Sequence, residues 1–154
     1  MADGAVVIVY SSRSGSTSRL SASIAEGSAE AAPDRSVVRV DAFSAGPPDV
    51  LAAAAVIIAT PAHFGYMSGA VKDFLERIWH PCLDHTRGKP WAILAKGDTD
   101  VDGAVESVSR IVGGLGWRLV AEPVRVVGAV DQEALDAAFE LGATVAAGVD
   151  AGMY

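Results

Sequence analysis

Short polar side chains gather where the first apolar run of the sequence passes into a helical pattern. The apolar run at 5–10 is followed by Ser11-Ser12-Arg13-Ser14-Gly15-Ser16-Thr17. The free N–H groups and the positive end of the dipole at a helix start favour an anion. The segment therefore predicts a phosphate pocket. The alternative is that the serines only cap the helix, and this segment alone supports both interpretations equally.

The familiar nucleotide motifs fit this segment poorly. A P-loop requires a lysine directly after its second glycine, and no lysine follows Gly15. A dinucleotide fingerprint requires three spaced glycines, whereas this segment has one. A hydroxyl-lined loop without a lysine is suited to a single terminal phosphate monoester.

Two further loops carry residues that could contact the same ligand. The segment 60–69 displays His63, Phe64 and Tyr66 between a proline and two glycines, which suggests a planar ligand on which a ring can stack. The alternative is that Phe64 packs inward and Tyr66 begins a helix. The segment 96–103 offers polar backbone, and Asp100 there could serve only to cap the next helix.

The elements that position these loops alternate between strand and helix. Strands are expected at about 5–10, 36–41, 55–60, 91–96 and 118–127, and helices at about 16–31, 66–79, 101–115 and 131–148, with a turn near 49–53. This pattern predicts an α/β fold with a doubly wound, five-stranded parallel sheet in the order 2-1-3-4-5. Pro123 suits an edge strand. Ligands of such sheets bind beside the carboxyl ends of strands 1 and 3, where all three loops meet.

Composition limits the class of protein. The 154 residues suit one domain spanning 1–154, and the net charge of −7 argues against a nucleic-acid partner. We see no signal peptide and no apolar stretch long enough for a membrane, so a cytoplasmic location is expected. The lone Cys82 excludes an internal disulfide. The segment 80–85, with two histidines and Cys82, matches no zinc spacing, and no metal site is expected.

Two motifs resemble those of a known superfamily. The segment Ser12–Thr17 is similar to the Ser/Thr-x-Thr/Ser-Gly-x-Thr phosphate loop of the flavodoxin-like superfamily. The segment Thr60–Gly69, followed by Val71-Lys72-Asp73-Phe74-Leu75, resembles the Pro-Thr-x-Phe-Gly-x-Met segment of the WrbA-like NAD(P)H:quinone reductases. The resemblance covers essentially the whole chain. It implies a three-layer α/β/α sandwich, the five-stranded flavodoxin-like form of the predicted sheet, with FMN as its cofactor.

The resemblance also assigns roles to individual residues. The phosphate of FMN would be bound by Ser12, Arg13, Ser14, Gly15, Ser16 and Thr17. The flavin would be lined by Pro61, Ala62, His63, Phe64 and Gly65, and its pyrimidine edge bordered by Lys96, Gly97 and Asp98. Four features depart from the family pattern. Arg13 puts a cation in a loop that normally works through backbone and hydroxyl groups, and His63 stands where the WrbA-like segment commonly has arginine. The third loop offers no aromatic ring, and the chain is shorter than those reductases.

Two functions remain compatible with FMN. The first is an oxidoreductase that takes hydride from NADPH or NADH and passes two electrons to a quinone or similar acceptor, with His63 orienting or protonating that acceptor. The second is a flavodoxin-type carrier that shuttles electrons between redox partner proteins. Cations near the flavin, namely Arg13 and Lys96, favour the first. A homodimer is possible, since Trp79 and Trp91 suit either a dimer contact or the core.

Overall fold

The main strands of the sheet run parallel and follow the predicted order. The computed structural model describes residues 4–154. Strands β2 (Val37–Asp41), β1 (Val6–Tyr10), β3 (Ala55–His63), β5 (Pro90–Gly97) and β6 (Arg118–Leu119) lie side by side in that order. Strand β7 (Val124–Val127) also pairs with β5 in parallel, beyond β6 along the same edge. The predicted order 2-1-3-4-5 is therefore confirmed.

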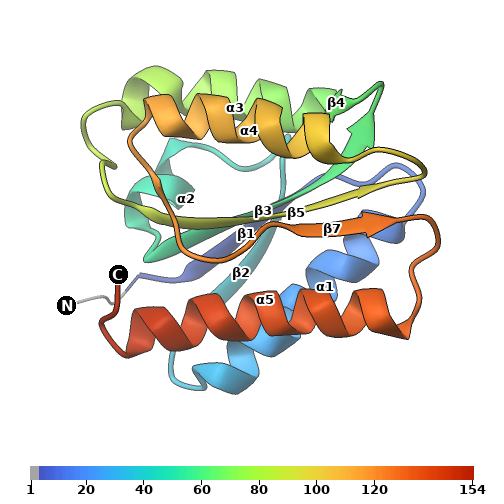
Figure 1. Cartoon of the computed structure of the whole chain (residues 1–154). Coiled ribbons are helices and arrows are strands. Elements are labelled where there is room, and N and C mark those ends of the chain that lie inside the picture. The colour runs from blue at the N-terminus through green and yellow to red at the C-terminus, as the bar shows by residue number, and fades with distance from the viewer. Residues whose placement is uncertain (1–3) are drawn as a thin grey trace.

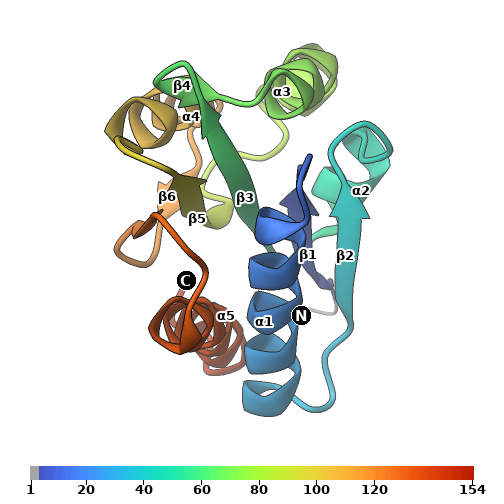
Figure 2. The ribbon, with the colours of Figure 1, turned by 90° about the vertical axis from the view of Figure 1, so that its right-hand side faces the viewer.

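Helices cover both faces of the sheet (Figure 1). Helices α1 (Ser16–Ala31) and α5 (Gln132–Asp150) lie on one face. Helices α2 (Pro47–Ala52), α3 (Gly69–Cys82) and α4 (Asp102–Gly114) lie on the other. Figure 2 views these layers from the side on which the parallel strands end, with the start of α1 beside β1 and β3. This is the expected three-layer sandwich.

Successive side chains of the central strands point alternately into two apolar cores, one on each face of the sheet. In β1, Val6 and Ile8 pack with residues of α1 and α5, whereas Val7 and Val9 pack with residues of α3 and α4. All four side chains are buried, because helices cover both faces of this strand. Continuous apolar runs of this kind are typical of strands buried on both sides. Because both cores hold β1 in the sheet, the loop that follows β1 has a defined position at the carboxyl edge of the sheet.

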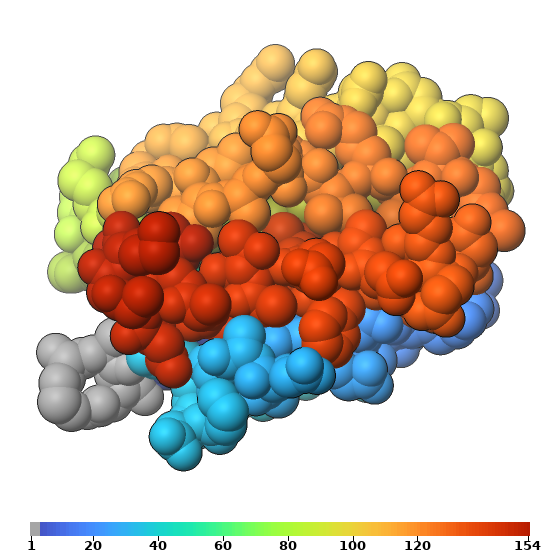
Figure 3. All heavy atoms as spheres, turned by 60° about the horizontal axis from the view of Figure 1, so that its bottom comes forward, coloured from blue at the N-terminus to red at the C-terminus, as the bar shows by residue number. Residues whose placement is uncertain are grey.

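Small residues bring α1 and α5 into close contact. A Cβ atom added to Gly27 would lie 1.9 Å from the carbonyl oxygen of Phe139, and one added to Gly142 would lie 2.0 Å from that of Ile24. Ser28 Oγ donates to the carbonyl of Gly142 across the same contact, at 3.2 Å. Figure 3 shows α5 along one face of the molecule with α1 next to it. Close packing against α5 thus positions α1 and the loop that precedes it.

Three predicted boundaries are wrong, each for a local reason. The strand expected at 118–127 is two strands, because Pro123 has no N–H for the ladder. The helix expected at 66–79 begins at Gly69, where the hydroxyl of Ser68 caps it by accepting from Val71 N at 3.3 Å. The segment before it is a hairpin rather than a loop, because β3 continues to His63 and pairs with β4 (Tyr66–Met67). Within residues 4–154 the sheet thus has seven strands rather than five.

Other sequence predictions concern residues that lie away from the carboxyl edge of the sheet. Trp91 is buried in the core, and Trp79 is half-buried against Gly114, where an added Cβ would meet the indole ring at 2.6 Å. Cys82 is a free, buried thiol. Within residues 4–154, no three metal-binding side chains come together. Across the same range, no helix combines the length and apolar character needed to cross a bilayer.

Candidate functional site

The loop between β1 and α1 exposes backbone donors at a helix start. Gly15 precedes the first helical residue with φ of 100°, and no side chain caps the helix. Ser12 Oγ instead accepts from Gly15 N at 3.0 Å, which holds the turn closed. Among the described residues, the N–H groups of Ser16 and Thr17 donate to no acceptor. The simple capping interpretation therefore does not describe this loop, and its donors are available to an anion.

The hairpin of β3 and β4 forms the second side of the site. Thr60 is fully buried, and its hydroxyl donates to Pro61 O at 2.8 Å while accepting from Ser68 N at 3.1 Å. These bonds fix both ends of the hairpin. Phe64 forms the turn with φ of 55°, and its side chain is fully exposed. The ring expected to line a ligand therefore lies at an open tip, while His63 is half-buried below it.

Helix α4 holds the hairpin in place. Met67 N donates to Ser107 Oγ at 3.2 Å. A Cβ atom added to Gly103 would lie 1.9 Å from the carbonyl oxygen of Gly65 at the hairpin turn. Because Gly103 belongs to the first turn of α4, the loop that leads into this helix and the hairpin occupy fixed positions relative to each other.

The end of β5 supplies the third side and one half-buried cation. Lys96 Nζ donates to Asp98 Oδ1 at 3.0 Å. The two partners differ in environment, since the lysine side chain is 15% exposed and the aspartate side chain 90%. Asp100 Oδ1 accepts from Asp102 N at 2.9 Å, so Asp100 supports the start of α4 as expected. The lysine charge is thus the less hydrated of the pair.

These three segments enclose one hollow of about 120 Å³. It is lined by residues of all three predicted segments: Ser12, Arg13, Ser14, Ser16, Thr17, Pro61, Ala62, His63, Lys96, Gly97 and Asp98. Of the predicted site residues, Gly15, Phe64 and Gly65 lie outside this lining, the glycines shaping turns and Phe64 standing in solvent. The structure therefore brings together most of the residues that the sequence selected.

A neighbouring hollow contains residues that sequence reasoning missed. Its volume is about 470 Å³, and it is lined in part by Asp41, Phe43 and Ser68. Asp41 ends β2 and Phe43 follows it. The available signal was the end of the second strand, which must reach the same sheet edge as the ends of strands 1 and 3.

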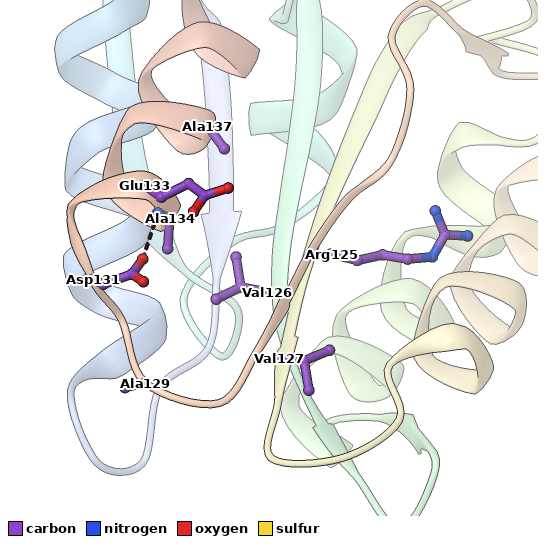
Figure 4. Close-up of a pocket in the computed structure, with 8 residues that line it drawn as sticks. All are labelled: Arg125, Val126, Val127, Ala129, Asp131, Glu133, Ala134 and Ala137. Carbon is purple, nitrogen blue, oxygen red and sulfur yellow. Dashed lines mark hydrogen bonds between the residues drawn. The ribbon is translucent and has the colours of Figure 1, made fainter.

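A third hollow lies beside β7 and the start of α5, with a volume of about 260 Å³ (Figure 4). Two carboxylates, Asp131 and Glu133, line it. Asp131 Oδ1 accepts from Ala134 N at 2.9 Å, so the first turn of α5 is already capped. Figure 4 shows the Arg125 side chain directed away from these acids, consistent with its ion pair to Asp102 at 2.8 Å. This hollow is unsuited to a phosphate.

Two groups remote from the site, the Cys82 thiol and the Lys89 ammonium, have shifted pKa values. Burial raises the pKa of the Cys82 thiol, and the positive charge of Lys89 opposes that rise. Burial also lowers the pKa of Lys89, whose ammonium group donates to Ala53 O at 2.6 Å. A buried thiol with a raised pKa is a poor nucleophile, so Cys82 serves packing rather than chemistry.

The residues present fit the phosphate of FMN. Free N–H groups at the start of α1 and the hydroxyls of Ser12, Ser14 and Thr17 offer donors for a phosphate. Gly97 lets the end of β5 pack closely against the hairpin, since a Cβ there would lie 3.1 Å from both Ala62 Cβ and Val101 Cγ1. The fold is a doubly wound domain, with this crevice at the carboxyl edge of its sheet.

Comparison with known families places the chain. The model of the flavodoxin domain family matches residues 7–137, and the chain therefore belongs to that family. It is a flavodoxin-fold redox domain, with a flavin as the implied cofactor. The resemblance seen in the sequence is confirmed at this level. No curated protein matches the chain in sequence.

Solved structures show the same fold at low sequence identity. A flavodoxin from the domain Archaea has a TM-score of 0.83 at 16% identity, with 94% of this chain and 98% of that chain covered. The WrbA-like flavodoxin protein of Agrobacterium tumefaciens has a TM-score of 0.78 at 20% identity, with 96% and 98% covered. Two-electron reduced Megasphaera elsdenii flavodoxin has a TM-score of 0.77 at 18% identity, with 92% and 98% covered. At these identities the likeness establishes the fold.

Proposed function

We propose that this chain binds FMN in the crevice at the ends of β1, β3 and β5 and uses it to reduce a quinone or similar acceptor with NADPH or NADH. The phosphate would accept hydrogen bonds from the first turn of α1 and from Ser12, Ser14, Ser16 and Thr17, with Gly15 shaping their loop and Arg13 beside it. The flavin would lie between the hairpin residues 61–65 and the segment Lys96-Gly97-Asp98. Bound FMN would supply the hydride-accepting and electron-donating chemistry, and the residues named above would hold and orient it.

The overall reaction balances without another reactant. NAD(P)H supplies a hydride, and the medium supplies one proton. The quinone gains two electrons and two protons and becomes a hydroquinone. His63 is half-buried in the crevice wall, and within residues 4–154 its side chain makes no hydrogen bond, so the imidazole is free to orient or protonate a carbonyl oxygen.

The half-buried charge of Lys96 is the observation that favours two-electron chemistry. A positive charge close to the cofactor stabilises its negatively charged, fully reduced form. Asp98 pairs with this lysine but is almost entirely solvated, so its field is screened more strongly than that of Lys96. Two cations, Arg13 and Lys96, thus line the crevice with one carboxylate, that of Asp98.

One observation favours a flavodoxin-type carrier as the second candidate. The segment that follows β5 carries the exposed carboxylates of Asp98, Asp100 and Asp102, of which Asp98 pairs with Lys96 and Asp102 with Arg125, and the whole chain has a net charge of −7. A negative charge there would attract a positively charged redox protein. This candidate uses the same FMN and differs only in how electrons enter and leave.

Anaerobic titration of the FMN-loaded protein with NADPH, and separately with NADH, distinguishes the two functions. We expect one equivalent of at least one nicotinamide to bleach the visible flavin absorbance promptly. A quinone added afterwards should restore the absorbance. Flavin that remains oxidised with both nicotinamides, yet is reduced by dithionite, would contradict the reductase and leave the carrier.

A further inference from the structure

A second hollow adjoins the proposed FMN crevice on the side of β2. Its volume is about 470 Å³, and it shares Ser12, Arg13 and His63 with the crevice. A molecule in this hollow would therefore contact the same side chains as the cofactor. The hollow is formed where the loop after β2 faces the start of α3.

An aromatic ring is presented to this hollow by a fixed loop. The Phe43 side chain is 68% exposed, although it lines the hollow. The backbone around it is held from outside, because Arg77 on α3 donates to the carbonyls of Ala42 and Ala45 at 2.7 Å each. Phe43 N also donates to Asp41 Oδ1 at 2.8 Å. The ring is thus positioned by the backbone without being used in the core.

Donors gather on the opposite side of the hollow. Ser11 is only 7% exposed, and within residues 4–154 its hydroxyl has no hydrogen-bond partner. In the same range, the N–H groups of Gly69 and Ala70 at the start of α3 donate to no acceptor, and the exposed Arg13 guanidinium forms no ion pair. The single carboxylate in the lining is that of Asp41, which already accepts from a backbone N–H.

We infer that this hollow binds a flat aromatic molecule that carries one anionic substituent. Its ring would stack on Phe43, and its anionic group would face Arg13 and the first turn of α3. Ser11 would donate a further hydrogen bond. Asp41 at the β2 side disfavours a second anionic group there. The inference rests on the proposed function in one respect, since such a molecule would serve as the electron acceptor beside the cofactor.

Equilibrium dialysis of naphthoquinone sulfonate against the oxidised protein, with and without FMN and without any nicotinamide, tests the site. We expect the sulfonate to bind at one site and at least tenfold more tightly than unsubstituted naphthoquinone. Phe43→Ala should weaken its binding about tenfold, whereas Phe43→Tyr should retain it. Leu119→Ala removes an exposed apolar side chain of β6 and serves as the matched control, with unchanged binding.

FMN affinity is measured on the same variants. It should be unchanged in Phe43→Ala, because Phe43 lies outside the crevice that holds the cofactor. Equal sulfonate binding by the wild type and Phe43→Ala would overturn the site, as would complete exclusion of the sulfonate by saturating FMN. Because no reduction step is involved and the chain is also tested without FMN, these results stand apart from any failure of FMN binding or of reduction by NADPH.

Discussion

Replacement of Lys96 by glutamine should make the bound FMN harder to reduce. The substitution keeps the approximate length of the side chain and removes its positive charge. Lys96 lines the crevice with only 15% of its side chain exposed, so its charge acts through partly dehydrated protein. The fully reduced flavin is more negative than the oxidised form, and it therefore loses more stabilisation than the oxidised form does.

The size of the effect follows from Coulomb's law. A unit charge about 5–8 Å from the site of reduction, at an effective dielectric constant of about 20–40, contributes about 1–3 kcal/mol. For a two-electron couple this corresponds to a fall of about 20–60 mV in midpoint potential. Asp98→Asn should shift the potential in the opposite direction and by less, because the aspartate side chain is 90% exposed.

The potential is measured at saturating FMN by slow anaerobic reduction beside a reference dye. Lys72→Gln is the matched control, since Lys72 pairs with Glu76 on α3 and lies outside the lining of the crevice. A fall confined to Lys96→Gln would support the argument. A shift in Lys96→Gln that equals the shift in Lys72→Gln, or that goes upward, would refute it.

Three further substitutions test the backbone and the buried thiol. Gly15→Ala should weaken FMN binding by about 1–2 kcal/mol, because φ of 100° is strained for any residue with a Cβ. Calorimetry measures this affinity. Gly113→Ala is the control and should leave FMN binding unchanged, because Gly113 has an ordinary helical φ and its added Cβ would meet no atom within 4 Å. Gly27→Ala should lower the free energy of unfolding by about 1–3 kcal/mol in urea, because its Cβ would overlap Phe139 O, and stability equal to that of Gly113→Ala would contradict this. Burial raises the pKa of the Cys82 thiol above its ordinary value of 9.0, so the folded state keeps the thiol proton to a higher pH than the unfolded state does. The free energy of unfolding of the wild type should therefore fall relative to that of Cys82→Ala as the pH rises above about 9. Parallel pH profiles of the two proteins would count against this prediction.

The order of the sheet could be predicted because hydrophobic pattern determines it. Continuous apolar runs such as Val6–Val9 are buried on both faces, and Pro123 restricts its segment to an edge. The bounds of α1 could also be predicted, since a serine-rich loop precedes an amphipathic pattern. The phosphate-binding segment followed from the same reasoning, because strand 1 must deliver it to the carboxyl edge.

The hairpin could not be predicted, because its cause is tertiary. Ring-bearing residues at 63–66 were compatible with a ligand-lining loop, and the helical pattern could extend back to Tyr66. In the structure, Ser107 and Gly103 of α4 accommodate β4 and the turn, and these contacts join positions about 40 residues apart. The position of Phe64 in solvent follows from that contact, and no local pattern encodes it.

The hollow beside Phe43 was missed for a related reason. Strand β2 is short and partly exposed, so its sequence pattern gives no indication that the loop after it contributes to a site. Arg77 fixes this loop from α3, more than 30 residues further along the chain. Long-range contacts of arginine side chains with backbone carbonyls carry no periodic signal in sequence.

Calorimetric titration of the chain with FMN and with riboflavin tests the central claim most directly. The two ligands share the flavin ring and differ in the phosphate, for which the loop before α1 provides donors. Several charge-assisted hydrogen bonds of about 1.5–3 kcal/mol each predict one FMN per chain and at least about a hundredfold weaker binding of riboflavin. Equal affinity for the two ligands, or no binding of FMN, would contradict the assignment of this crevice.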